Sequence, residues 1–141
     1  MAYVKIWVHS VWGSKNRYPF LQKELKDRLI THIKQNAKTK KIYIDTINSH
    51  SDHMHILIAL NADMSIATTL QLIKGESSNW INKEKLTKAK FAWAGEYFAE
   101  SVSESDLYKV RNYINNQEEH HKKKTFEEEC KEIFKDFNGQ G

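Results

Sequence analysis

The feature that most constrains the fold of this chain is a pair of histidines, His53 and His55, separated by one apolar residue at the start of a hydrophobic run. Residues two apart in a β-strand point to the same side and lie about 7 Å apart, so both imidazoles can face one divalent cation. Met54, Ile56 and Ile58 then face the opposite side. The pattern predicts a strand that is anchored in a core through one face and carries a metal site on the other. The competing interpretation is that the two histidines have this spacing by chance and bind no metal.

A second feature is the pair Tyr113 and Gln117, four residues apart in a segment with helical periodicity. Four residues make slightly more than one helical turn, so the two side chains are expected on one face. A phenol and an amide oxygen on that face are able to supply a nucleophile and a third metal ligand. A tyrosine beside an apolar stripe also packs against a neighbour without any chemical role, and these residues alone leave both interpretations open.

Length and charge set broad limits. The chain has 141 residues, and 22 Lys+Arg against 18 Asp+Glu give a net charge of +4. This length predicts one domain over residues 1–141, and the mild basic bias permits a phosphate-bearing partner. The single cysteine, Cys130, cannot form an internal disulfide and is expected to pack in a core. Because no run approaches the ~18 apolar residues of a membrane span, we expect a soluble protein of the cytoplasm.

Hydrophobic periodicity predicts an alternation of strands and helices. Strands are expected at 3–12, 42–47 and 53–58, with a further extended region over 91–102 that is broken at Gly95. Helices are expected at 21–37, from Ser65 onward with an interruption at Gly75, at about 104–119, and at about 126–137. Thr125 and Glu128 have the spacing of a capping box and predict the start of the last helix. Residues 48–52 are turn formers that lead into the His53 strand. The order predicts an α+β protein with a ferredoxin-like, or RRM-like, antiparallel sheet.

Polar side chains near these elements are candidate contacts to phosphate. They are Lys15 and Arg17 in a basic loop, Lys74 and Ser77 at the weak point of a helix, and Lys122 in a charged connector. A solvated or structural role is the alternative for each of them. Asp52 is able to orient a neighbouring imidazole, but it caps the turn equally well. His9, in the first strand, is interpreted as a polar group on a half-buried strand.

Together these motifs resemble the HUH transposases with a single catalytic tyrosine, small enzymes that move insertion sequences as single-stranded DNA. The resemblance covers nearly the whole chain and rests on His53-Met54-His55, Lys74-Gly75 with Ser77-Ser78, and Tyr113 with Gln117. It implies an HUH palm domain in which His53, His55 and Gln117 bind Mg²⁺ or Mn²⁺. It also implies that Tyr113 attacks a DNA phosphate, giving a 5′-phosphotyrosine intermediate and a free 3′-hydroxyl that later rejoins strands.

The resemblance further implies partners. The substrate would be single-stranded DNA with stem-loops near element ends, and a homodimer would supply Tyr113 in cis or in trans. The protein would be associated with the nucleoid when bound to DNA. Hard Mg²⁺ usually prefers oxygen ligands, so two imidazoles leave the native ion open. Two other functions stay open: a domesticated relative that cuts repeat hairpins, and a non-catalytic RRM-like protein that binds single-stranded nucleic acid.

Overall fold

The centre of the fold is a four-stranded antiparallel sheet with strand order β2-β3-β1-β4. A computed structural model describes residues 3–117 and 125–133. Its strands are β1 (Trp7–Gly13), β2 (Tyr43–His50), β3 (His53–Ala59) and β4 (Phe98–Val102). Its helices are α1 (Lys23–Thr39), α2 (Ile66–Lys83), α3 (Leu107–Asn115) and α5 (Phe126–Ile133), with short 3₁₀ turns at Lys15–Arg17 and Glu104–Asp106. The predicted α+β, ferredoxin-like class is confirmed.

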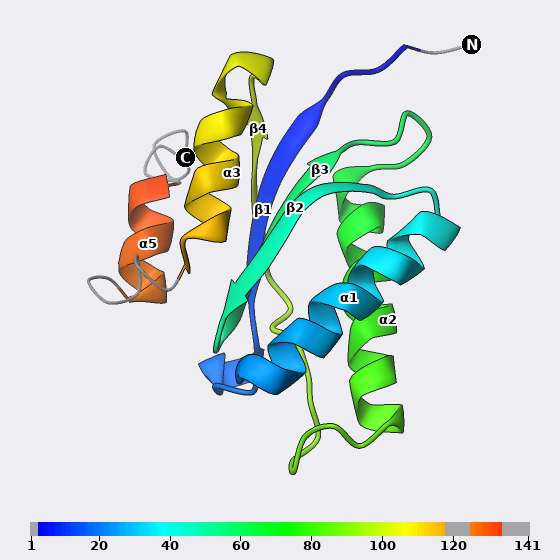
Figure 1. Cartoon of the computed structure of the whole chain (residues 1–141), viewed down its shortest axis with the longest axis vertical. Helices are drawn as coiled ribbons and strands as arrows, with labels where there is room; N and C mark the ends of the chain where they lie inside the picture. Colours follow the sequence, from blue (N-terminus) through cyan, green and yellow to red (C-terminus); the bar gives the residue numbers. More distant parts are fainter. Residues whose placement is uncertain (1–2, 118–124, 134–141) are drawn as a thin grey trace.

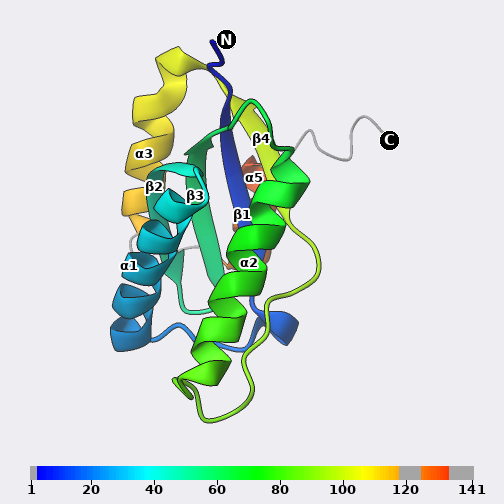
Figure 2. The same ribbon diagram turned by 90° about the vertical axis from the view of Figure 1, so that its right-hand side faces the viewer.

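The helices form two layers, one on each face of the sheet. Figure 1 shows α1 and α2 on one side of the strands and α3 and α5 on the other, and the turned view of Figure 2 agrees. The inner strands β1 and β3 pair so that Gly13 lies opposite His53 and Val11 opposite His55. The histidine strand is therefore central, with a helical layer over each face.

The alternation of β3 sets the direction of the two histidines. Met54, Ile56 and Ile58 are fully buried in the core shared with α1 and α2. Leu57 faces the opposite layer, where it packs with Leu107 and Ile114. Burying each of these large apolar side chains is worth about 1.5–3 kcal/mol, and a slip of one residue would turn all three away from this core. The core thus holds the histidines on the α3 and α5 face, as the sequence predicted.

Side-chain caps start two of the helices as expected. The Ser65 hydroxyl accepts a hydrogen bond of 3.0 Å from the Thr68 amide at the start of α2. Thr125 and Glu128 form the predicted reciprocal box at α5, with both bonds at 3.2 Å. Helix α2 passes Gly75 without a break, so the predicted interruption is wrong. Its buried stripe from Leu70 to Ile81 outweighs the weak propensity of one glycine.

Three predicted boundaries differ from the structure. Strand β2 runs to His50, which pairs with His53, the first residue of β3, so the predicted turn over 48–52 shrinks to residues 51–52. The backbone groups of residues 48–50 form hydrogen bonds in the sheet and not in a loop. The first strand begins only at Trp7. Of the extended region 91–102, only Phe98–Val102 is a strand, and Trp93 makes a single bridge to Ser14.

The predicted helix over 104–119 is also divided. A 3₁₀ turn precedes α3, and the helix ends at Asn115, so Gln117 lies after a turn at Asn116. The rest of that prediction, and the part of the 126–137 helix after Ile133, lie outside the described residues.

Candidate metal and nucleophile site

The two histidines of β3 converge on one carboxylate. His53 and His55 are both 0 % exposed, and they lie beneath the α3 and α5 layer. Glu129, from α5, places Oε1 3.2 Å from His53 Nε2 and 2.5 Å from His55 Nε2. Ligand atoms of these three residues lie within 4.8 Å of one another, which is a spacing that one metal ion can bridge.

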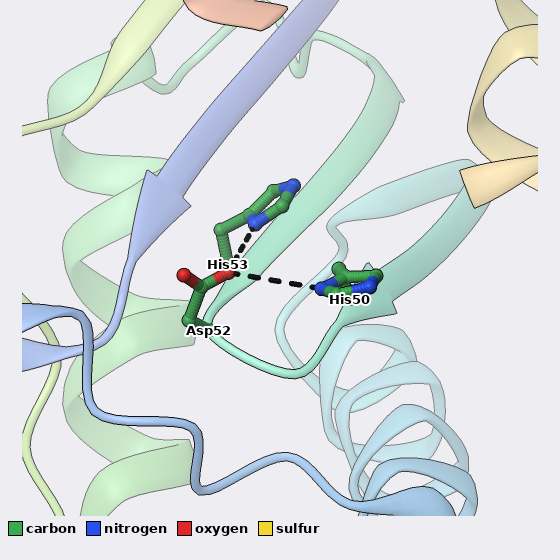
Figure 3. A group of neighbouring side chains, drawn as sticks. All are labelled: His50, Asp52 and His53. Atoms are coloured by element: carbon green, nitrogen blue, oxygen red, sulfur yellow. Dashed lines mark hydrogen bonds and ion pairs between the residues drawn. The ribbon is translucent and has the colours of Figure 1, made fainter. Parts of the chain in front are cut away.

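Asp52 holds the far side of the His53 ring. Its Oδ1 accepts a hydrogen bond of 2.7 Å from His53 Nδ1, and it also lies 3.9 Å from His50 Nδ1 (Figure 3). Burial acts to lower the pKa of His53, but its bonds to Asp52 and Glu129 outweigh burial and raise that pKa. Asp52 therefore contacts the His53 imidazole, and its role in orienting that ring stays a prediction.

His9 holds the far side of the His55 ring. A hydrogen bond of 3.0 Å joins His9 Nε2 to His55 Nδ1, and the two rings stack with centroids 5.3 Å apart. Burial, with the adjacent His55, lowers the pKa of His9 to about 3, so this ring is neutral near pH 7. Each β3 histidine thus has its Nδ1 held by a neighbour and its Nε2 directed at Glu129, an arrangement typical of metal-bound imidazoles.

Glu129 is a site residue that the sequence interpretation missed, and His9, which it took for a polar group on a half-buried strand, is 2 % exposed. Glu129 is 1 % exposed, and burial acts to raise its pKa, but hydrogen bonds from His53 and His55 hold that pKa well below the usual range. It lies 74 residues from His55 along the chain. The hydrophobic periodicity over 126–137 predicted a helix, but it did not indicate which residues that helix would cover.

Tyr113 lies beside the histidines of its own chain. Its ring centroid is 5.7 Å from that of His55 and 6.4 Å from that of His9. Burial, together with the carboxylate of Glu129 to which the phenol is hydrogen-bonded, raises the pKa of Tyr113 well above its ordinary value. The phenol is therefore neutral here, and it lies next to the converging nitrogen and oxygen atoms.

Gln117, the predicted third ligand, is fully buried just after α3. Its Nε2 donates a hydrogen bond of 3.2 Å to the Tyr113 carbonyl. Its Oε1 is buried and has no hydrogen-bond partner among the described residues. A buried amide oxygen without a donor is costly, and a cation would satisfy it. Metal binding by Gln117 stays a prediction.

The predicted DNA contacts lie in different parts of the molecule. Arg17 is near the site, with its Nε 3.8 Å from Asp52, its Nη2 3.3 Å from Glu127, and its guanidinium 4.7 Å from the centre of the Phe126 ring. Lys15 is exposed in the same 3₁₀ turn.

Lys74 and Ser77 belong to α2, on the other face of the sheet. Lys74 Nζ donates to the Ala94 carbonyl at 2.8 Å, and burial lowers its pKa. Ser77 is 0 % exposed; its hydroxyl donates to the Ile73 carbonyl and accepts from Trp93 Nε1. These contacts tie α2 to the segment before β4 and do not bring either residue to the histidines. Lys122 lies outside the described residues.

A ferredoxin-like sheet that carries two convergent histidines beside a tyrosine is the arrangement of an HUH-type DNA-processing enzyme. A family model described as "Transposase IS200 like" matches residues 2–117. The chain belongs to this family, which makes it a transposase of the HUH type and a DNA-cleaving enzyme. The sequence-based resemblance is thereby confirmed. His53, His55, Tyr113 and Gln117 fall within the matched residues, whereas Glu129 lies beyond them.

The chain is also similar in sequence to a known transposase, and its fold is similar to those of two solved structures. The chain is 26 % identical over 115 residues to the ISDra2 transposase TnpA of Deinococcus radiodurans, covering 77 % of this chain and 81 % of the relative. A crystal structure of a Deinococcus radiodurans R1 protein assigned as a transposase has a TM-score of 0.67 at 24 % identity, covering 83 % of this chain and 95 % of that one. A REP-associated tyrosine transposase bound to a REP hairpin has a TM-score of 0.63 at 18 % identity, with coverages of 86 % and 72 %.

The described helices include none with the length and apolar character needed to span a bilayer.

Proposed function

We propose that this chain is a metal-dependent transposase that nicks and rejoins single-stranded DNA through a 5′-phosphotyrosine on Tyr113. The supporting observation is the placement of the Tyr113 ring 5.7 Å from the His55 ring, in a chain of the IS200-like transposase family. In this reaction the phenol oxygen bonds to phosphorus as the bond from phosphorus to the 3′ oxygen breaks. The 3′ end leaves as a hydroxyl, and the 5′-phosphate stays on the tyrosine.

The site fits a divalent cation, Mg²⁺ or Mn²⁺. The residues that would hold it are His53 and His55, with Gln117 as the predicted oxygen ligand. A cation bound there would polarise the phosphate oxygens and offset developing negative charge. Asp52 and His9 orient the two imidazoles, and the layer formed by α3 and α5 keeps bulk water from rings that are 0 % exposed. Burial and Glu129 keep the phenol neutral beforehand, so it loses its proton on attack. The leaving 3′ oxygen takes up one proton to become the hydroxyl, so the step has no net change in protons.

The substrate we propose is DNA with stem-loops near element ends. The REP-associated relative is bound to a REP hairpin, which supports a hairpin ligand for this chain too. We further propose that the protein forms a homodimer, in which Tyr113 acts in cis or in trans. We also propose that it is cytoplasmic and associates with the nucleoid when it binds DNA. A domesticated role in cutting repeat hairpins stays open as well. Genomic context separates the two roles, since a mobile element has paired ends flanking the gene and a domesticated enzyme has scattered repeats.

The test is covalent capture. Hairpin-bearing single-stranded DNA incubated with the protein and Mn²⁺ is expected to give an adduct that survives denaturing electrophoresis. Tyr113→Phe should abolish the adduct, while Tyr108→Phe, in the same helix but 59 % exposed, should form it normally. Equal adduct from Tyr113→Phe and the parent protein would make the assignment wrong.

A non-catalytic RRM-like binder is the second function to test. Such domains stack bases on an open sheet face. Here the face opposite α1 and α2 carries α3 and α5, and His9, His55 and Leu57 on it are 0–2 % exposed. This covering disfavours base stacking on the sheet. Metal-independent DNA binding that is unchanged by His53→Ala with His55→Ala would favour the binder instead.

A further inference from the structure

Helix α5 inserts an acidic side chain into the site, although it lies beyond the residues that match the family. The Phe126 ring stacks on the His53 ring, with centroids 4.2 Å apart and planes 15° apart, and Arg17 covers the Phe126 ring. One turn later, Glu129 is 1 % exposed and meets both Nε2 atoms through a single oxygen. A carboxylate is buried at such a cost that it needs a charged or strongly donating partner.

Hydrogen-bond accounting identifies the kind of partner. Asp52 Oδ1 lies 2.7 Å from His53 Nδ1, and an ionised carboxylate only accepts, so this nitrogen carries the proton. A neutral His53 then has its lone pair on Nε2, facing the Glu129 carboxylate, which is also an acceptor. Two acceptors in contact repel unless a proton or a cation lies between them.

A metal ion meets this requirement better than protons do. With protons alone, the Nε2 atoms of both His53 and His55 must carry one, and His53 then becomes an imidazolium because its Nδ1 already donates to Asp52. The His55 ring, with its centroid 5.2 Å away, must at the same time accept through Nδ1 from His9 to stay neutral. One divalent cation would instead accept a lone pair from each neutral ring and from Glu129 Oε1 at once. Two histidines and one carboxylate form a common donor set for divalent metals, and the carboxylate supplies the hard oxygen that Mg²⁺ and Mn²⁺ prefer.

We propose that Glu129 is a ligand of the catalytic metal ion, in addition to His53 and His55. This inference rests on the proposed metal site of the two histidines and extends it with a residue from outside the family match. Its consequence is that the ion connects α5 to β3. Metal binding then orders α5 as well as the site.

The test measures Mn²⁺ binding to the full chain without DNA, by isothermal titration calorimetry and by the loss of the free-ion electron paramagnetic resonance signal. Glu129→Gln keeps the size of the side chain and is expected to weaken Mn²⁺ binding by about tenfold or more, at least as much as the loss of an orienting partner. Glu128→Gln removes the same charge from the exposed neighbour, keeps a capping-box residue, and should bind within about twofold of the parent protein.

Unchanged or tighter binding by Glu129→Gln would overturn the proposal, because the carboxylate would then be a competitor of the ion. His53→Ala separates this failure from that of the proposed function. If His53→Ala loses Mn²⁺ binding while Glu129→Gln retains it, the histidine site stands and ligation by Glu129 is rejected. Absence of Mn²⁺ binding by the parent protein would reject both.

A measurement on the unaltered chain guards against a variant that folds poorly. Mn²⁺ should slow amide hydrogen exchange in Phe126–Ile133 as well as in β3. Slowing confined to β3 and α3 would contradict ligation by Glu129.

Discussion

At the residue scale, orientation of the imidazoles depends on neighbours that do not touch the ligand position. His9 is 2 % exposed and joins His55 Nδ1 at 3.0 Å. Because burial and the adjacent His55 lower the pKa of His9 to about 3, its ring is neutral and carries one N–H. The proton between His9 Nε2 and His55 Nδ1 must lie on His55 if the lone pair of His55 Nε2 is to be available for a cation.

We therefore expect His9→Leu to weaken Mn²⁺ binding by about tenfold while the sheet still folds, since loss of an orienting partner typically costs about 10- to 100-fold in metal affinity. Calorimetric titration with Mn²⁺ measures this change, and circular dichroism checks the fold. His32→Gln is the control, because His32 lies in the opposite layer, where it contacts Glu76 and stacks on Trp80. Parental affinity in His9→Leu would show that His55 is oriented without this bond.

The stability of the metal-free protein is expected to depend on pH through Glu129 and His53. Hydrogen bonds from His53 and His55 outweigh burial and hold the pKa of Glu129 below its ordinary 4.5, so its contribution to stability is present above pH 4.5 and is lost as pH falls through the folded value. The carboxylates of Asp52 and Glu129 outweigh burial and raise the pKa of His53 above 6.5, so its contribution is present below pH 6.5 and is lost as pH rises through the folded value.

The contact between Glu129 and the histidines should therefore stabilise the metal-free protein most between pH 4.5 and 6.5. Thermal unfolding in a chelator, compared for the parent protein and Glu129→Gln across this window and on both sides of it, is the measurement. The difference in Tm is expected to be largest inside the window. A difference that keeps growing toward alkaline pH would contradict the assigned pKa directions.

At the element scale, the apolar contact between α5 and the sheet is a small cluster among the described residues. Val11, Phe98 and Cys130 pack with Phe126, which also lies between His53 and Arg17. This cluster is small compared with the core between the sheet and α1 and α2. An element with few buried contacts opens at lower free energy than the rest of the fold.

We expect Phe126→Ala to speed amide exchange in Phe126–Ile133 while the exchange of β1 and β3 stays near that of the parent protein. Truncating a buried aromatic ring costs about 3–5 kcal/mol in a well-packed core, and here the loss falls on α5 alone. Hydrogen exchange with mass spectrometry measures the change. Lys131→Ala, at an exposed position of the same helix, is the control. Uniformly faster exchange throughout the sheet would show that α5 is part of the global folding unit.

Elements were predictable from the sequence to the extent that their signals are local. The alternation from Met54 to Ile58 fixed the direction of the histidines, and the Thr125 and Glu128 box fixed the start of α5. The contact of Glu129 with His55 could not be predicted, because it depends on where a separate helix docks 74 residues away. The bond from His9 to His55 depends on the β1 and β3 register, which pairing sets and which one strand alone does not specify.

At the scale of the whole molecule, the candidate site is formed by segments that are far apart along the chain. Strand β3 supplies the imidazoles, α3 supplies Tyr113, and α5 supplies Glu129. Helices α3 and α5 lie on the side of the sheet opposite α1 and α2 (Figure 1). We therefore expect the hydrophobic core on the other face to form without the site. Alterations to the site residues should accordingly affect metal binding and adduct formation more than overall stability.

One chain is expected to hold a complete site. The Tyr113 ring is 5.7 Å from the His55 ring of the same chain, so the nucleophile and the imidazoles already meet within one subunit. Mixing Tyr113→Phe with a variant that carries both His53→Ala and His55→Ala should therefore yield no DNA adduct. If Tyr113 instead acts in trans, each dimer of mixed subunits regains one intact site, and the adduct returns to a fraction of the parental yield. Adduct formation with hairpin DNA and Mn²⁺ at matched protein concentration measures the difference, and unmixed variants define the background.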